Sequence, residues 1–177
     1  METLNSIGWL SIRASIGYVY LYALYMNTRD AAARQWLIEH TGYMFPNLTG
    51  QSRKLVILLA AIGGMLMMFV GGISVLLAIE PRVGAALLLL FTAIGIYQHR
   101  REREVAMAVA EKIQGSIADS LKLDLTTLQW SAYSGHFSSG LKNWALCGMC
   151  AGVIGWSISP NPPLWVVLSD RIAGLIK

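Results

Sequence analysis

The stretch LVILLAAIGGMLMMFVGGISVLLAI, residues 55–79, contains 25 residues and no charged side chain. As an α-helix it would be about 37 Å long, more than the roughly 30 Å of hydrocarbon in a bilayer. Of the 177 residues in the whole chain, 55% are hydrophobic and 14% are charged, whereas soluble domains carry about 25% charged residues. The stretch and the composition together predict an integral membrane protein.

Three further apolar stretches complete the predicted fold. We expect an all-α integral membrane protein, a four-transmembrane-helix bundle with short interfacial amphipathic helices, in which residues 1–177 form a single membrane domain. The predicted spans are residues 6–26, 55–79, 83–98 and 141–159. The connection Glu80-Pro81-Arg82 allows only a tight hairpin, so the second and third spans should be antiparallel neighbours. Residues 164–177 are predicted to form a tail that lies along the interface.

Basic residues gather in the two long connections between these spans. Residues 27–54 and 99–143 hold ten Lys and Arg side chains, whereas the N-terminus, the hairpin and the tail hold three. The positive-inside rule therefore places both connections in the cytoplasm and both termini outside, in a prokaryotic cytoplasmic (inner) membrane. Apolar residues recur every four positions from Val105 to Leu121, which predicts an amphipathic cytoplasmic connection over residues 99–140. Its apolar face could contact lipid, a partner subunit or this bundle.

Arg13 is a cation inside the first predicted span. At a depth of roughly 10 Å an unpaired charge costs on the order of 1–3 kcal/mol. Glu80 is the acid held closest to it at the same membrane surface, so we predict an Arg13–Glu80 polar pair, formed directly or through water. One interpretation is a structural clasp or a snorkelled arginine. The other is that Arg13, with Tyr20 on the same helix face, orients a polar ligand such as a quinone or a lipid headgroup.

Gln98 and His99 end the third predicted span. A glutamine amide beside an imidazole can hydrogen-bond a quinone carbonyl, and the imidazole can pass a proton. Together with Arg13 and Tyr20, these residues form the predicted binding site for a quinone or a lipid headgroup. The alternative is an interface histidine without a ligand. The sequence identifies no catalytic residue.

Two cysteines and two further histidines are weighed as reactive groups. Cys147 and Cys150 lie on one face of the fourth predicted span, where they could form a redox pair. Redox use of C-x-x-C places the first cysteine at a helix N-terminus, so here small-residue packing is the favoured interpretation. His40 and His136 are predicted in loops on the cytoplasmic side, and we assign no metal site. No nucleotide-binding loop or zinc-protease motif is present, and no nucleic-acid partner is expected.

Three segments carry a family resemblance: IRA at residues 12–14 with Gly17, the run from GG at 71–72 to EPRVGAALLL at 80–89, and GLKNWALCG at 140–148. In their order along the chain these segments resemble the DoxX/DoxD-like family of small four-span membrane proteins. The resemblance implies polar positions at Arg13, Glu80, Arg82, Lys142 and Asn143. Residues 103–133 depart from the compact family pattern and are a candidate docking element.

The resemblance also implies a function. It implies a membrane subunit of a respiratory or sulfur/thiol-redox oxidoreductase complex, such as thiosulfate:quinone oxidoreductase, near the quinone pool. Quinone is then the implied cofactor, and other membrane-protein subunits and the lipid bilayer are the implied partners. Whether the chain is itself an enzyme stays open. The alternative is a non-catalytic scaffold subunit that docks on a larger membrane complex and holds lipid or pigment. A small-molecule transporter is a third interpretation.

Overall fold

The structure describes residues 2–156, and most of them are in helices. The structure is a computed structural model, and within that range it contains no strand. Its elements are α1 (Glu2–Thr28), α2 (Ala31–Gly42), α3 (Gly50–Leu77), α4 (Pro81–Gln114), the short 3-10 helix η1 (Asp119–Leu121) and α5 (Lys122–Trp156). The predicted all-α class is confirmed.

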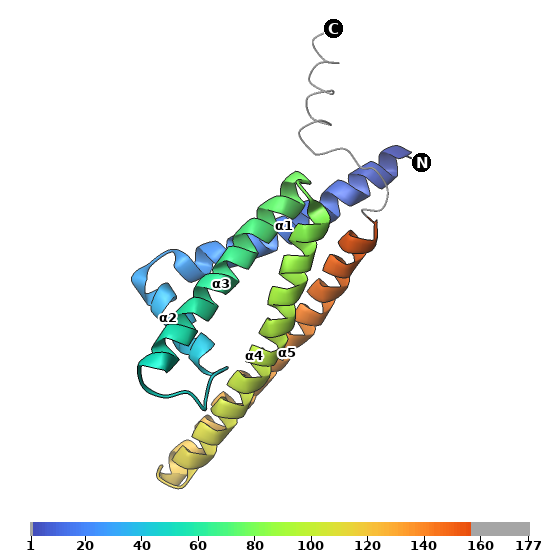
Figure 1. The fold of residues 1–177 in the computed structure, drawn as a ribbon. Coiled ribbons are helices and arrows are strands. Elements are labelled where there is room, and N and C mark those ends of the chain that lie inside the picture. The colour runs from blue at the N-terminus through green and yellow to red at the C-terminus, as the bar shows by residue number, and fades with distance from the viewer. Residues whose placement is uncertain (1, 157–177) are drawn as a thin grey trace.

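The four long helices pack in the order α1, α3, α4, α5 (Figure 1). α3 contacts both α1 and α4, α4 contacts α5, and α1 also reaches α5. The N-terminal end of α1, the α3–α4 turn and the C-terminal end of α5 lie at one end of the bundle, with the α4–α5 turn at the other. All four helices contribute to the core, whose fully buried side chains include Ile16, Met68, Val75, Leu88 and Val153.

The α3–α4 turn is as tight as the sequence predicts. α3 ends at Ala78 in a left-handed conformation with φ of 55°, and Glu80 has φ of 48°. The Ser74 hydroxyl donates hydrogen bonds to the carbonyl oxygens of Ile79 and Glu80, and the Glu80 carbonyl oxygen also accepts the Gly84 N–H in the first turn of α4. Pro81 begins α4, where its missing N–H is not needed. The predicted antiparallel pairing of α3 with α4 is confirmed.

Two of the described helices, α3 and α4, are long and apolar enough to cross a membrane. Only 28% and 22% of their most apolar segments are buried inside the protein, whereas the core helix of a soluble protein would be mostly covered. Leu59, Leu66 and Leu90 are each more than half exposed. An exposed apolar surface of this extent suits contact with lipid. Within the described residues α1 and α5 do not reach the same hydropathy, so this finding supports two of the four predicted spans.

The connection predicted at residues 99–140 is helical for most of its length. α4 continues from its apolar part to Gln114 and α5 begins at Lys122, so the prediction of a loop at His136 is wrong. The prediction of a loop at His40 is wrong too, because His40 lies in α2. The two helices have 34 and 35 residues, about 50 Å each, roughly 20 Å longer than the hydrocarbon of a bilayer. α4 and α5 pack on each other, and this packing stabilises the helical form of residues 133–140, whose own helix propensity is low. The predicted tail, 164–177, and the end of the fourth predicted span lie outside the described residues.

Glycines bring α3 close to both of its neighbours. A Cβ atom on Gly84 of α4 would lie 2.6 Å from the Cβ of Ser74 and 3.0 Å from the carbonyl oxygen of Gly71. A Cβ atom on Gly17 of α1 would lie 2.8 Å from the Cβ of Leu76. These separations are shorter than van der Waals contact allows, so the close approach of the helices requires glycine. A Cβ atom on Gly63, also in α3, would meet no described atom within 4 Å.

The first prediction concerns the α3–α4 contact. Gly84→Ala should lower the free energy of unfolding by about 1–3 kcal/mol, because the new methyl group displaces Ser74 and its turn hydrogen bonds. The control Gly63→Ala should raise it by about 0.5–1 kcal/mol, since it gains helix propensity without a clash. Thermal unfolding in detergent measures both. Equal shifts in the two variants would contradict the described packing.

Candidate functional site

A buried carboxylate joins α4 to α5 where α4 becomes charged. Glu102 is 5% exposed. One of its oxygens, Oε1, accepts a hydrogen bond from Gln98 Nε2 at 2.9 Å. The other, Oε2, lies 2.9 Å from Nδ1 of His99 and 3.1 Å from Nδ1 of His136. Gln98 and His99 lie one turn before Glu102 on the same helix, whereas His136 belongs to α5. We call His99, Glu102 and His136 the His–Glu–His cluster.

Hydrogen bonds keep the Glu102 carboxylate ionised. Burial by itself would raise the pKa of Glu102. The hydrogen bonds from His99 and Gln98 and the electrostatic effect of the two imidazoles lower the pKa by more than burial raises it, so the pKa lies below the usual glutamate value. Glu102 follows the apolar part of α4, in the charged run after residue 98. A buried charge with several hydrogen-bond partners is a strong constraint on the two helices that carry them.

The arginines around the cluster have other partners. Arg100 Nε and Arg101 Nη1 contact the Glu104 carboxylate at 3.2 and 2.5 Å. The guanidinium of Arg103 lies 5.1 Å from the ring centroid of Tyr133 on α5. The polar contacts of Glu102 therefore come from its histidine and glutamine neighbours, while the basic side chains that follow His99 contact Glu104 and Tyr133.

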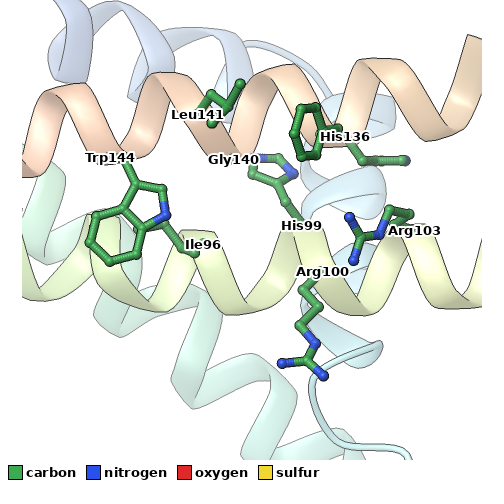
Figure 2. Close-up of a pocket in the computed structure, with 9 residues that line it drawn as sticks. Ile96, His99, Arg100, Arg103, His136, Gly140, Leu141 and Trp144 are labelled. Atoms are coloured by element: carbon green, nitrogen blue, oxygen red, sulfur yellow. The ribbon is translucent and has the colours of Figure 1, made fainter.

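Each member of the cluster lines two of three cavities. His99 and Glu102 line a cavity of about 600 Å³, Glu102 and His136 one of about 330 Å³, and His99 and His136 one of about 160 Å³. Figure 2 shows the smallest, in which His99 from α4 and His136 from α5 lie between the facing helices. The His–Glu–His cluster therefore lies where these three cavities adjoin, and its titratable side chains line all three.

The largest of these three cavities is lined by residues of α1, α2, α3, α4 and α5 and has an apolar wall with a polar end. Its apolar wall includes Met65, Met67, Met68, Phe91 and Ile94. Its polar end is formed by Gln98, His99, Glu102 and Asn143. The volume lies within the range of roughly 300–1,000 Å³ that is usual for small-molecule sites. Such a cavity can hold an amphipathic molecule whose polar group meets the amides and the imidazole.

The structure brings together two of the four predicted ligand-binding residues. Gln98 and His99 both line the largest cavity. Tyr20 does not: it is buried in the core, where its hydroxyl bonds Thr92 and lies 3.9 Å from the Cys150 Sγ. Tyr20 packs edge-on against Phe91, a residue of the cavity wall, so its role is to support that wall.

Arg13 makes no described direct contact with Glu80, and it does not line the cavity of about 600 Å³. The Arg13 side chain is 3% exposed, and its guanidinium lies 5.9 Å from the Trp9 ring centroid. Its Nε and Nη1 atoms have no hydrogen-bond partner among the described residues. Glu80 is exposed at the α3–α4 turn, and no described ion pair joins it to Arg13. Arg13 packs along its own helix over Trp9, and an Arg13–Glu80 pair stays a prediction.

Cys147 and Cys150 are free thiols in α5. Cys150 is fully buried in the core, where an external oxidant has no access, whereas Cys147 is partly exposed. The arrangement favours packing over a redox pair.

Sequence reasoning missed Glu102 and placed His136 wrongly. The spacing H-x-x-E at residues 99–102 is a local signal, because residues three apart share a helix face. Glu102 stands between Arg101 and Arg103, and such a run is usually a solvated face. No local signal pairs His136 with His99, since that depends on the register of α5 against α4.

No protein-family model matches the chain, and no match was found among curated proteins or among solved structures. The DoxX/DoxD-like resemblance therefore stays a prediction.

The second prediction tests the cluster as a structural link. Glu102→Ala removes the acceptor that Gln98, His99 and His136 share, and should lower the free energy of unfolding by about 1–3 kcal/mol. Glu111→Ala, an exposed acid further along α4, should change it by less than about 0.5 kcal/mol. Chemical unfolding in detergent, followed by near-ultraviolet circular dichroism, measures the difference. A Glu102→Ala variant as stable as Glu111→Ala would show that the cluster does not hold the helices together.

Proposed function

We propose that the protein crosses a prokaryotic cytoplasmic membrane four times, with both termini outside. The hydropathy and exposed apolar surface of α3 and α4 support two crossings. α1 has 27 residues, about 40 Å, and α5 is longer still, so both can span the hydrocarbon. The alternating directions of the four helices put the two basic connections at one end of the bundle, as the positive-inside rule requires.

Within that membrane we propose that the protein is a quinone-binding subunit of a respiratory or sulfur/thiol-redox oxidoreductase complex. One observation carries the proposal: the cavity of about 600 Å³ has a methionine-rich apolar wall and ends at Gln98, His99 and Asn143. A quinone has a matching distribution of apolar and polar parts: its ring and tail are apolar, and its two carbonyl oxygens accept hydrogen bonds. The side-chain amides and the imidazole could donate hydrogen bonds to one carbonyl oxygen.

The cluster gives a bound quinone a path for protons. Reduction to the quinol takes two electrons and two protons, and the electrons would come from a redox-active partner subunit. His99 lines the cavity and contacts Glu102, which in turn contacts His136 and the next cavity. An imidazole and a carboxylate in contact can relay protons towards the quinone oxygens from the charged end of α4.

The third prediction concerns a variant that fills the cavity without disturbing its walls. Gly63 lines the cavity, and a Cβ atom placed there would have no described atom within 4 Å, so Gly63→Phe should fill the space. We expect the Kd for a short-chain ubiquinone analogue to rise at least about tenfold, which corresponds to about 1.4 kcal/mol. Asn143→Leu should raise it about fivefold through loss of one hydrogen bond. Quenching of tryptophan fluorescence reports binding, since Trp36 lines the same cavity.

Gly148→Phe on α5 is the matched control for quinone that partitions into the detergent. Gly148 also has no described atom within 4 Å of a Cβ position, but it does not line the cavity. Saturable quenching should persist in this variant. Quenching that is equally saturable in Gly63→Phe and in the unmodified protein would contradict quinone binding in this cavity.

A scaffold subunit is the second candidate function, and the far half of the α4–α5 hairpin favours it. Leu123, Leu128 and Trp130 are 75%, 68% and 63% exposed, beyond the apolar part of α4. These side chains suit attachment to another membrane subunit, with lipid or pigment held at the interface.

The fourth prediction separates the two functions. The contacts of Arg103 with Tyr133 and of Gln129 with Met107 give the register of the hairpin, so a short Gly-Asn loop can replace residues 108–128. If the protein is a scaffold, this shortened chain should lose copurifying subunits while Gly63→Phe keeps them. If it is a quinone subunit, the shortened chain should keep its quinone affinity. A shortened chain that retains every partner would contradict the scaffold function.

A further inference from the structure

Two imidazoles and a carboxylate converge on one point between α4 and α5. The ligand atoms of His99, Glu102 and His136 all lie within 4.8 Å of one another. We propose that this His–Glu–His cluster binds a divalent first-row transition-metal ion, of the class of Zn²⁺ or Fe²⁺. The proposal goes beyond the proposed function: the metal site shares His99 and Glu102 with the quinone cavity, but it also requires His136, which does not line that cavity.

The distances between the ligand atoms suit such an ion. Metal–ligand bonds of about 2.0–2.2 Å hold neighbouring ligand atoms about 3–3.5 Å apart. The Glu102 Oε2 atom lies 2.9 Å from one imidazole nitrogen and 3.1 Å from the other. A metal ion would lie between these atoms, with both imidazoles neutral and Glu102 ionised.

The chemistry of the ligand set selects the class of ion. Two imidazoles with one carboxylate suit zinc, iron and cobalt, whereas calcium and magnesium prefer oxygen ligands alone. Gln98 donates a hydrogen bond to the second oxygen of Glu102 and thereby orients the carboxylate, as outer partners of metal ligands usually do. The nearby arginines oppose a cation less than their number suggests, because Arg100 and Arg101 contact Glu104.

Three protein ligands leave room for an exchangeable one. His99 and His136 line the cavity of about 160 Å³ shown in Figure 2, together with Arg100, Arg103 and Trp144. This space can hold a water molecule or a small anion on the metal, with the two arginines at its border. Metal sites with three protein ligands and an open position are typical of reactive centres, whereas structural zinc sites have four protein ligands.

Cobalt titration of the full chain in detergent tests the site. After treatment with a chelator, the protein should bind one Co²⁺ per chain with visible d–d absorption, and Zn²⁺ should displace it. His99→Ala, Glu102→Gln and His136→Ala should each raise the Co²⁺ Kd by at least about tenfold, and Gln98→Ala by about tenfold. His40→Ala is the control and should leave the Kd unchanged, because the His40 Nδ1 atom bonds the Trp36 carbonyl oxygen outside the cluster. Absence of the bands, or an unchanged Kd in His136→Ala, would overturn the proposal.

The variant His136→Cys distinguishes loss of a metal ligand from loss of binding through misfolding. A thiolate at this position should give a new sulfur-to-cobalt charge-transfer band, which only a ligand in contact with the metal can produce. Bound Co²⁺ without that band would overturn the assignment of His136. Gly63→Phe should keep Co²⁺ binding while it loses quinone binding, so the metal site and the proposed function can fail separately.

Discussion

The arrangement of the site depends on one buried charge, the Glu102 carboxylate. A charge removed from water is costly unless it is fully hydrogen-bonded, and Glu102 meets this demand with partners from two helices. Its partners on α4 follow from helix geometry, but His136 reaches it only at one rotation and one register of α5. The carboxylate therefore sets the relation of the two longest helices. It also places two imidazoles side by side at the junction of three cavities.

Two kinds of contact hold α4 in the bundle: close packing at a glycine near its start, and polar contacts of charged side chains further along. Near its start, Gly84 lets α3 approach closely, and the contact consists of backbone and small side chains. Further along, where α4 becomes charged, hydrogen bonds and ion pairs replace close packing. Between these two parts of α4, residues of α3 and α4 line the largest of the three cavities. In the proposed membrane arrangement the apolar wall that α3 and α4 give this cavity lies at the depth of the lipid hydrocarbon, while the His–Glu–His cluster lies at the membrane boundary.

Much of the fold follows from local features of the sequence. The charge-free run at residues 55–79 predicts α3, and the short connection after it predicts the hairpin with α4. Adjacent Gln98 and His99 were predicted to share a polar site, and they do line one cavity. These features depend only on neighbouring residues, so the sequence alone is enough to identify them.

The parts that sequence reasoning missed depend on contacts between distant segments. Glu102 lies in a run of charged residues, and its burial depends on α5 covering it. Residues 133–140 contain small and polar side chains typical of a loop, yet packing against α4 keeps them helical. Arg13 was paired with Glu80 from depth alone, but depth does not fix the direction of a long side chain, and Arg13 packs over Trp9 instead.

The central claim is that lipid surrounds the bundle up to the His–Glu–His cluster and that α4 leaves the membrane there. Spin labels on single cysteines in a background without Cys147 and Cys150 test it in vesicles by power saturation. The exposed positions Leu90, Tyr97 and Ile113 report along α4. The account predicts that oxygen relaxes the label at residue 90, that a water-soluble nickel reagent relaxes the label at 113, and that the label at 97 is intermediate. Equal access of the nickel reagent to residues 90 and 113 would contradict it.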